Sequence, residues 1–580
     1  MSALFGRRGF IGTLCALFAG AFLLVFVPVT AAAVLIPYPY AHFPLLTCAV
    51  FLGTGVVLFL AYRRLSRVSG FLERRFGVLL LLFSLLMLTA QLVLGAHLRF
   101  QPAFDLEALY QGALEWLETG SFGTYASSTC HADYFAIFPN NLGGLVFLTL
   151  LFRPAATLGI TDWFGVAMAA NAVLVVSSMV LTALSCRRLW GAPTAITACL
   201  LFALSPPFWF MAPVFYTDTL SMVFPAAVFY LYVCSRAETR RIRLALYYAG
   251  MGILAALGAL LKATVLIILI AILIALLCEK RWRRATALAG AALCLIPLLF
   301  AGLRAYTAAH QQTSAAAAQE SMPLSYWLAL AVQGEGTYNH AIFQLGRSIR
   351  DPAARDAALR EQVLAGLQKQ GIGGALTLPI RKSVRAFSDG TFALSDFLDD
   401  TPLTPNGLHR FLLYKGEYHP LYQSLCNGVW GAVLLLLLLS LRLHGKNRRP
   451  CAVFAAQVAL FGLWLFLMLW EINSRYITNF LPLLYLCAAG GMKPFSHLVR
   501  RARHRLHVRC LPPHIVSDGD IAEAAHRTSC ENSVKNKTGH KIRCAPRWSV
   551  HRLRCFPAVS RRCSTGNSSR TTTALRRSPA

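Results

Sequence analysis

The chain has 580 residues, of which 56% are hydrophobic and only 14% are charged, and its formal net charge is +30. Soluble domains are about half apolar and about a quarter charged, so this composition excludes a soluble protein and indicates a polytopic membrane protein. The charge does not indicate nucleic-acid binding, because residues 493–580 alone carry 19 Lys and Arg against 4 Asp and Glu. Most other basic residues form short clusters between apolar runs, as cytoplasmic loops do.

The apolar runs predict an all-α membrane protein with about thirteen transmembrane helices, since a spanning helix needs roughly 20 apolar residues. These runs are 10–36, 43–62, 76–98, 136–152, 163–186, 193–211, 219–234, 245–261, 263–278, 285–303, 427–443, 451–470 and 476–491. Residues 245–278 are too long for one helix, and we expect a break at Lys262. The basic clusters place 99–135 outside and Arg187 inside. Either 136–152 only dips into the membrane, or 154–186 is a hairpin of two short helices.

The chain divides into five predicted regions. They are N-terminal accessory spans (1–75), a membrane core (76–303) with an acidic outer loop (99–135), an α-rich extracytoplasmic domain (304–426), C-terminal spans (427–492) and a basic cytoplasmic tail (493–580). The best helix of the outer domain is 351–370, with Asp351 as its N-cap, Pro352 in first position and Gly371 just past its end.

The tail is rich in Arg, Ser, Thr and His, without apolar periodicity, so we expect it to be disordered. It is either a polybasic segment attracted to lipid or a terminal stretch without selected function. Its five cysteines fit no zinc module, and no metal site is predicted.

Ionisable residues at the outer ends of spans are the candidate functional groups, because charges at membrane depth are costly and mark functional sites. The predicted outer side gathers Asp105, Glu107, Asp133, Asp218, Lys262, Glu471 and Arg475. Each of them alone is equally explained as a solvated interfacial charge or a helix-packing ion pair.

Several ordered motifs within 75–491 carry a resemblance to a known family. They are Asp105-Leu106-Glu107, Tyr134-Phe135 with Phe138-Pro139-Asn140-Asn141, Tyr216-Thr217-Asp218, Gly258 with Leu261-Lys262-Ala263-Thr264, Ser388-Asp389-Gly390-Thr391, and Glu471 with Ser474-Arg475-Tyr476. Together they resemble membrane glycosyltransferases of the GT-C fold, in a family 39-like bacterial subgroup that uses polyprenyl-phosphate sugars. Where that fold has an Asp-x-Asp signature, this chain has Asp-x-Glu, and the tail has no counterpart.

The resemblance implies transfer of a sugar from a polyprenyl-phosphate donor to an envelope glycan, lipid or protein, with the active site on the extracytoplasmic side of the cell membrane. A positioned carboxylate is a plausible general base for the acceptor hydroxyl, and Asp105 is our candidate, with Glu107 orienting it or the acceptor. Lys262 and Arg475 are the candidate ligands of the departing phosphate, and attack opposite that phosphate would invert the anomeric centre.

The candidate substrate-binding residues are Tyr134, Asn140, Asn141, Tyr216, Asp218 and Glu471. Structural roles remain open for four of them: Asp218 as a helix N-cap or an ion-pair partner of Lys262, Tyr134 as an interfacial aromatic, and Asn140 with Asn141 as helix caps. No cofactor is expected. Mg²⁺ is compatible with the acidic pair, but the proposed chemistry does not require it.

Two other functional classes compete with the transferase. A secondary transporter or lipid-linked-sugar flippase would show internal repeats and mid-helix charges. This chain shows no repeats, and its charges lie at the outer ends of spans. A structural membrane partner without activity would not need the outer charge cluster.

Overall fold

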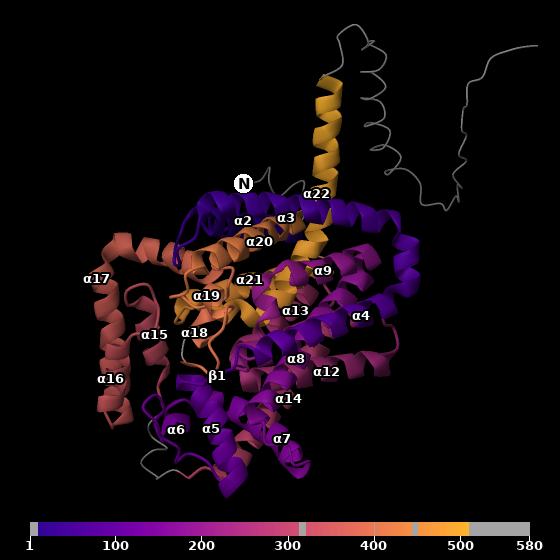
Figure 1. The fold of residues 1–580 in the computed structure, drawn as a ribbon. Helices are drawn as coiled ribbons and strands as arrows, with labels where there is room; N and C mark the ends of the chain where they lie inside the picture. The colour runs from indigo at the N-terminus through magenta and orange to yellow at the C-terminus, as the bar shows by residue number, and fades with distance from the viewer. Residues whose placement is uncertain (1–9, 313–320, 399–400, 444–450, 510–580) are drawn as a thin grey trace, which may run out of the picture. The chain divides into compact units, whose positions relative to one another are not determined.

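The computed structural model describes residues 10–312, 321–398, 401–443 and 451–509. The chain forms two units, residues 1–504 and 505–580, and the fold described below is that of the first. Its described part is almost entirely helical (Figure 1). The strands of the described ranges are β1 (Phe100–Gln101) and β2 (Thr401–Pro402), which pair antiparallel with Phe100 opposite Pro402.

The helices follow the apolar runs in chain order. Before β1 lie α2 (Phe10–Leu35), α3 (Pro44–Arg67) and α4 (Ser69–Ala96). The next group is α5 (Phe104–Thr119), α6 (Tyr134–Ile137), η1 (Pro139–Asn141), α7 (Leu142–Thr157), α8 (Trp163–Trp190), α9 (Ala192–Leu204), η2 (Pro206–Trp209), α10 (Thr217–Leu220) and α11 (Val223–Arg236). The third group is α12 (Arg241–Leu261), η3 (Ala263–Val265), α13 (Leu266–Cys278) and α14 (Trp282–Ala308).

The C-terminal half has shorter helices followed by long ones. The shorter region contains α15 (Leu324–Val332), α16 (His340–Ser348), α17 (Pro352–Phe387), α18 (Ser395–Leu398) and α19 (His409–Leu412). The last group is α20 (His419–Ser440), η5 (Leu441–Leu443), α21 (Ala452–Leu469), η6 (Ser474–Phe480) and α22 (Leu481–Arg509).

The all-α polytopic prediction is confirmed, but the number of long spans is lower than thirteen. Within the described ranges, nine helices are long and apolar enough to cross a membrane, judged by length and composition. Three apolar runs form shorter helices, α7 with 16 residues and α9 and α13 with 13 each. The run 476–491 begins in the 3₁₀ helix η6 and continues in α22.

The structure of residues 136–190 settles one of the two alternatives left open by the sequence. Helix α8 is continuous over 28 residues, so a hairpin of two short helices across 154–186 is wrong. Helix α7 is shorter than the roughly 20 residues that a spanning helix needs. The alternative in which this segment only dips into the membrane therefore stays our prediction.

Two predicted helix boundaries are confirmed, the break at Lys262 and the start of α17 at Asp351-Pro352. Helix α12 ends at Leu261 and Lys262 is extended, with φ −152° and ψ 113°. The Asp351 side chain caps α17 by accepting a hydrogen bond from the Ala354 backbone N–H at 2.7 Å. Gly371 interrupts α17 with φ 59°, a left-handed value that suits glycine, but a second helical segment continues to Phe387.

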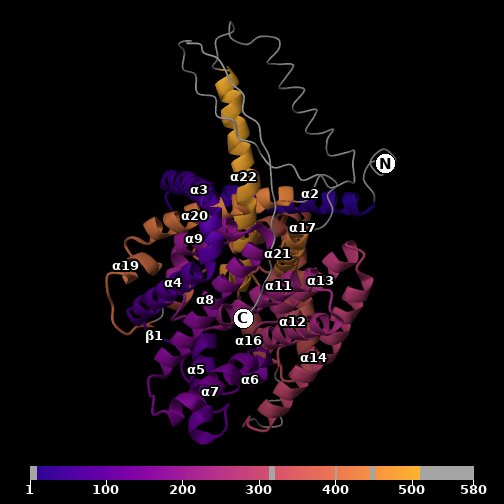
Figure 2. The ribbon, with the colours of Figure 1, turned by 90° about the vertical axis from the view of Figure 1, so that its right-hand side faces the viewer.

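The long helices pack against one another. Helix α20 lies against α2 and α3, and α8 lies against α4 and α9 (Figure 1). Helix α8 also contacts α11. The view turned by 90° shows α12, α13 and α14 as neighbours (Figure 2). Many leucines of α4 and α14 are exposed, such as Leu82 at 60% and Leu293 at 75%, as expected for side chains that face lipid.

The predicted tail begins as a helix. Helix α22 extends through Arg509, so the backbone of residues 493–509 is helical instead of irregular. The expected disorder of 510–580 lies outside the described residues. The five predicted region boundaries stay predictions.

Candidate functional site

Asp105 lies in the first turn of α5, where the helix dipole favours a negative charge. Its Oδ1 accepts a hydrogen bond from the Tyr134 hydroxyl at 2.7 Å, and its Oδ2 accepts one from the Tyr216 hydroxyl at 3.0 Å. The Asp105 side chain nevertheless keeps 39% of its surface exposed. Two buried tyrosines therefore orient a carboxylate that remains open on one side.

Arg475 approaches this carboxylate from the start of η6. Its Nη2 lies 3.9 Å from Oδ2 of Asp105. The guanidinium carbon lies 5.2 Å from the ring centre of Tyr216, 5.3 Å from that of Phe397 and 5.4 Å from that of Tyr476. Its buried Nε has no hydrogen-bond partner among the described residues. Aromatic faces thus hold the cation while one N–H donor remains available.

The two residues before Arg475 form hydrogen bonds with two carboxylates. The Asn473 Oδ1 accepts a hydrogen bond from the Arg475 backbone N–H at 3.0 Å, and the Asn473 Nδ2 donates to Oδ2 of Asp396 at 3.0 Å. The Ser474 hydroxyl donates to Oδ2 of Asp389 at 2.6 Å. The two residues that precede Arg475 therefore attach the start of η6 to the 388–398 segment.

Lys262 and Asp218 form an ion pair beside Arg475. Lys262 follows the last residue of α12, and its ammonium contacts Oδ1 of Asp218, a side chain that is 2% exposed. The same ammonium lies 4.6 Å from the ring centre of Tyr476. The N-cap of α10 is Tyr216, and the Asp218 carboxylate bonds to Lys262, so the N-cap role for Asp218 is wrong.

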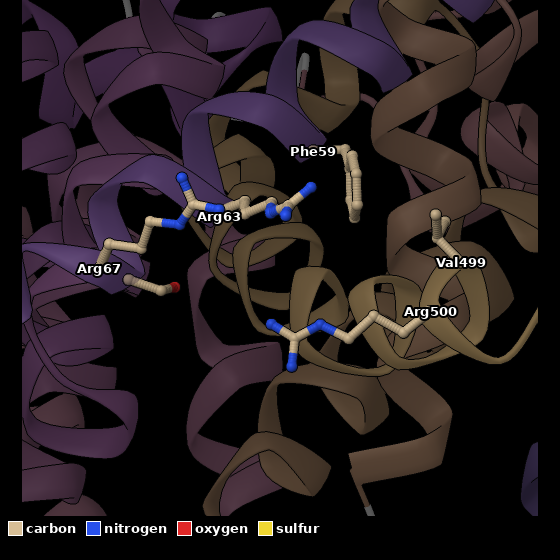
Figure 3. Close-up of a pocket in the computed structure, with 6 residues that line it drawn as sticks. Phe59, Arg63, Arg67, Val499 and Arg500 are labelled. Carbon is tan, nitrogen blue, oxygen red and sulfur yellow. The ribbon is translucent and has the colours of Figure 1, made fainter. Parts of the chain in front are cut away.

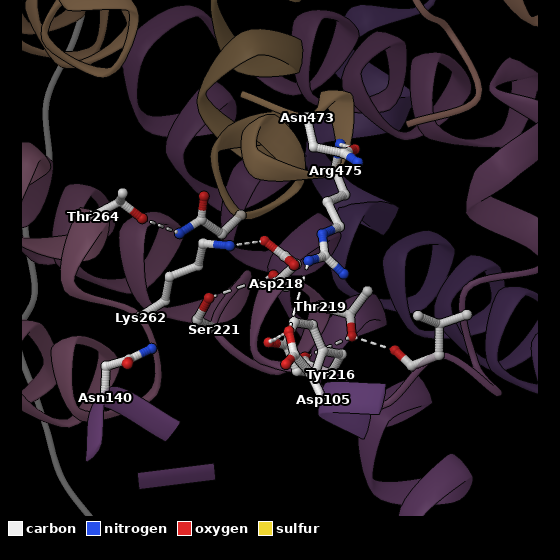
Figure 4. A network of polar contacts seen from close by, with 12 residues as sticks. Asp105, Asn140, Tyr216, Asp218, Thr219, Ser221, Lys262, Thr264, Asn473 and Arg475 are labelled. Atoms are coloured by element: carbon white, nitrogen blue, oxygen red, sulfur yellow. Dashed lines mark hydrogen bonds and ion pairs between the residues drawn. The ribbon is translucent and has the colours of Figure 1, made fainter. Parts of the chain in front are cut away.

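Shared aromatic neighbours join these groups into one cluster, of which Figure 4 shows Asp105, Tyr216, Asp218, Lys262 and Arg475. Tyr216 contacts both Asp105 and Arg475, and Tyr476 contacts both Arg475 and Lys262. The structure therefore brings together the candidate base and both candidate phosphate ligands. We call Asp105, Tyr216, Asp218, Lys262, Arg475 and Tyr476 the polar cluster.

A close contact between two helices positions Lys262. A side-chain carbon at Gly143 in α7 would overlap the backbone carbonyl of Leu260 in α12. Only glycine lets α7 approach the end of α12 this closely. The approach brings the residues that precede α7 beside the break at Lys262.

Glu107 points away from the polar cluster. It is 5% exposed and accepts hydrogen bonds from the Tyr125 hydroxyl at 2.7 Å and from the Thr129 hydroxyl. Residues two apart on a helix face in nearly opposite directions, so α5 separates the side chains of Asp105 and Glu107. The structure places Glu107 where it ties the 121–133 loop to α5.

Asn141 supports the base indirectly, and Asn140 stands apart. The Asn141 Nδ2 donates to the Tyr134 hydroxyl at 2.5 Å, which in turn bonds to Asp105. Asn141 occupies the N-cap position of α7, as the helix-cap alternative expects, but its side chain makes no capping hydrogen bond. Asn140 is exposed and contacts only the neighbouring amide, at 3.4 Å, among the described side chains (Figure 4).

Glu471 is a buried carboxyl between α21 and η6, with 9% of its surface exposed. Burial raises the pKa of Glu471 above its usual value, and the positive charge of Arg475 acts in the opposite direction. The charges of Asp105 and Lys262 also act on it. Glu471 therefore borders the polar cluster, and the charges of that cluster act on its pKa.

Two buried charged residues were not singled out from the sequence. Asp389 is fully buried and accepts five hydrogen bonds, from the N–H and hydroxyl of Thr391, the N–H of Ala393, the Gln423 amide and the Ser474 hydroxyl. Lys382 is 1% exposed and donates to the carbonyls of Met468 at 2.9 Å and Trp470 at 2.7 Å. The Ser388–Thr391 motif was the available signal for Asp389; the sequence offered none for Lys382.

Metal binding finds no support in the arrangement of acidic groups. Over the described ranges, no group of three or more His, Cys, Asp or Glu side chains is placed to hold a metal ion. The two carboxylates of the acidic pair engage different partners on different faces of α5. The metal requirement stays untested.

Comparisons with known proteins give one family and several solved structures, of which two are described here. No curated protein matches the chain. ArnT from Cupriavidus metallidurans, bound to undecaprenyl phosphate, has 14% identity and a TM-score of 0.33, over 71% of this chain and 77% of ArnT. The oligosaccharyltransferase AglB from Archaeoglobus fulgidus, in complex with an inhibitory peptide and a dolichol-phosphate, has 12% identity and a TM-score of 0.40, over 77% of this chain and 54% of AglB.

The family model described as "conserved hypothetical integral membrane protein" matches residues 41–493. That range contains every member of the polar cluster and all but the first of the helices described before α22 in full. The chain therefore belongs to this family of integral membrane proteins.

Proposed function

We propose that the chain is a membrane glycosyltransferase that moves a sugar from a polyprenyl-phosphate donor to an acceptor on the extracytoplasmic side. The observation that carries the proposal is the polar cluster, in which a half-open carboxylate lies 3.9 Å from a cation with an unused N–H donor. A general base beside a phosphate-binding cation is the arrangement that transfer from a lipid phosphate requires.

Asp105 is the proposed general base. The acceptor hydroxyl loses its proton to the Asp105 carboxylate as its oxygen bonds to the anomeric carbon of the donor sugar. The hydroxyls of Tyr134 and Tyr216 hold both carboxylate oxygens in place while the side chain stays accessible. Base catalysis of this kind typically contributes about 10²–10⁴-fold.

Arg475 is the proposed ligand of the leaving phosphate. The bond between the anomeric carbon and the phosphate oxygen breaks, and the electron pair leaves with the polyprenyl phosphate. The Arg475 side chain keeps 19% of its surface exposed, and its guanidinium fork can donate to two phosphate oxygens, a geometry that arginine supplies and lysine does not. Attack by the acceptor oxygen on the face of the sugar opposite the phosphate inverts the anomeric centre.

Lys262 adds a second positive charge, which a neighbouring carboxylate already partly neutralises. Its ammonium is already in contact with Asp218, whereas Arg475 keeps a gap of 3.9 Å from Asp105. Asp218 thus neutralises part of the lysine charge and fixes its position. The second oxygen of Asp218 is buried and has no hydrogen-bond partner among the described residues. Substrate-binding roles for Glu471, which borders the same space, and for exposed Asn140 remain part of the proposal.

The test is a transfer assay with the full chain in nanodiscs and synthetic polyprenyl-phosphate glucose, mannose and arabinose as separate donors. We expect at least one donor to release free polyprenyl phosphate in the presence of membrane extract as acceptor source. An Arg475→Ala chain should release it at least tenfold more slowly. Equal release by both chains with every active donor would overturn the proposal.

The same assay separates the transferase from a flippase. A flippase moves the intact lipid-linked sugar across the bilayer and leaves the anomeric carbon–oxygen bond unbroken. Donor that becomes accessible on the opposite leaflet, with no free polyprenyl phosphate formed, would therefore replace the transferase assignment by the transporter alternative.

A further inference from the structure

A second candidate site lies at the other end of α3 from the polar cluster. A groove of about 450 Å³ opens between the last turns of α3 and the segment of α22 near residue 500, and it is lined by Phe59, Arg63, Ser66, Arg67, Val499 and Arg500 (Figure 3). We call these six residues the basic groove. The rings of Phe59 and Phe495 meet edge to face at 6.1 Å and join the two helices there.

The basic groove and the polar cluster are far apart. The first turn of α3 lies toward the polar cluster, because the Phe43 N–H donates to the Ser424 hydroxyl, next to the Gln423 amide that bonds to Asp389. Asp389 in turn holds Ser474 beside Arg475. Helix α3 has 24 residues and so is about 36 Å long at 1.5 Å per residue, which separates its two ends by a membrane thickness.

Three positive charges line this groove without an acidic partner. Over the described residues, no ion pair or side-chain hydrogen bond joins Arg63, Arg67 or Arg500 to a carboxylate within 4.0 Å. Some other span-end arginines are paired, as Arg187 is with Glu73 at 3.0 Å. Like charges around one cavity repel, so the groove is suited to an anion that neutralises them.

The walls of the groove indicate that this anion carries a hydrocarbon chain. Phe59 and Val499 give the groove an apolar side, and the α3 surface leading to it exposes Val56 at 56% and Leu60 at 51%. Arginines at the end of a candidate span lie at the level of lipid headgroups. A phosphate at the arginines and acyl chains along α3 would satisfy both surfaces.

We propose that the basic groove binds the phosphate of an anionic phospholipid, with its acyl chains along the exposed face of α3. This site is independent of the proposed transferase reaction, since none of its residues belongs to the polar cluster. The arginine forks supply the charge-assisted hydrogen bonds that a phosphate diester accepts.

The test is native mass spectrometry of the full chain released from detergent micelles, with dioleoyl phosphatidylglycerol, dioleoyl phosphatidylcholine or inorganic phosphate as the added probe. We expect phosphatidylglycerol to bind at least tenfold more tightly than phosphatidylcholine. The groove variant Arg63→Gln/Arg67→Gln/Arg500→Gln should lose this preference. The control variant Arg64→Gln/Arg74→Gln/Arg75→Gln removes the same charge from exposed positions outside the groove and should keep it.

Three results would overturn the proposal. Retention of phosphatidylglycerol by the groove variant, or its equal loss in the control variant, would mean that the groove is not the binding site. Inorganic phosphate that competes as strongly as the phospholipid would mean a site for free anions. If the triple variant does not fold, the single Arg67→Gln chain, altered at an exposed side chain, replaces it, with a threefold or larger loss expected.

Discussion

Arg475 Nη2 and Asp105 Oδ2 lie 3.9 Å apart, and Tyr216 contacts both residues. This separation is too long for a hydrogen bond, so neither group saturates the other. Other residues hold both groups instead. Tyrosine hydroxyls bond to the carboxylate, and aromatic faces contact the guanidinium. The pair is preorganised and still has capacity for substrate.

Replacing Arg475 by lysine keeps the charge and removes the planar fork. Donors aimed at a developing anion are worth about 10²–10³-fold in rate, and a lysine in this place lacks the second N–H group. We therefore expect Arg475→Lys to lower the rate of polyprenyl phosphate release by about 10²-fold. Arg347→Lys is the matched control, because Arg347 pairs with Asp133 away from the cluster and should release phosphate at the wild-type rate.

Tyr134 acts as a positioning residue in this account. Tyr134→Phe removes the hydroxyl that fixes Oδ1 of Asp105 but leaves the phosphate ligands in place. We expect kcat to fall about tenfold with KM for the donor unchanged, in line with the loss of orientation at the base. Tyr125→Phe is the control, since its hydroxyl bonds to Glu107 instead. If both variants lose kcat equally, Glu107 contributes to the reaction as much as the account assigns to Asp105.

Much of this site was predictable because short-range sequence signals mark chain breaks. Lys262 within an apolar run predicted the end of α12, and Asp351-Pro352 predicted the start of α17. The ordered motifs also predicted that Asp105, Lys262 and Arg475 share one site. Each of those signals is local. The polar cluster forms where several of the chain breaks lie close together in space.

The direction of Glu107 was not predictable once the acidic pair was taken as part of a loop. The pair lies in the first turn of a helix, and helical geometry sends alternate residues to different faces. The roles of Asp389 and Lys382 depend on contacts with distant segments, which no local pattern records. The number of long spans was too high because apolar composition does not distinguish a buried short helix from a spanning one.

Asp389 should matter for stability more than for chemistry. Both carboxylate oxygens of Asp389 accept hydrogen bonds. An asparagine in its place would point its NH₂ group at the N–H or O–H donors that bond to one of these oxygens. We expect Asp389→Asn to lower the free energy of unfolding by about 2–4 kcal/mol, as leaving buried polar groups unpaired does. Asp351→Asn, at an exposed N-cap where asparagine serves equally well, should stay near wild type. Thermal unfolding in detergent measures both, and equal midpoints for the two variants would contradict this role.

The pH dependence of stability follows from Lys382. Burial lowers the pKa of Lys382 from 10.5 to about 8, against the opposing charge of Glu471. Between these values the unfolded chain binds a proton that the folded chain has released, so stability rises with pH through this window and is lost as pH falls through 8. The melting midpoint of the wild type minus that of Lys382→Met should therefore increase from pH 8 to 10.5. A difference that stays constant or narrows over this range would mean that the buried lysine keeps its proton.

Single-turnover transfer by Asp105→Asn, measured with the full chain in nanodiscs and the donor that the wild type uses, tests the central claim most directly. The account predicts a rate about 10²–10⁴-fold below wild type, with donor binding retained because Arg475 and Lys262 are unchanged. Asp133→Asn, at a carboxylate that pairs with Arg347, should transfer at the wild-type rate. Transfer at the wild-type rate by Asp105→Asn would contradict the assignment of Asp105 as the base.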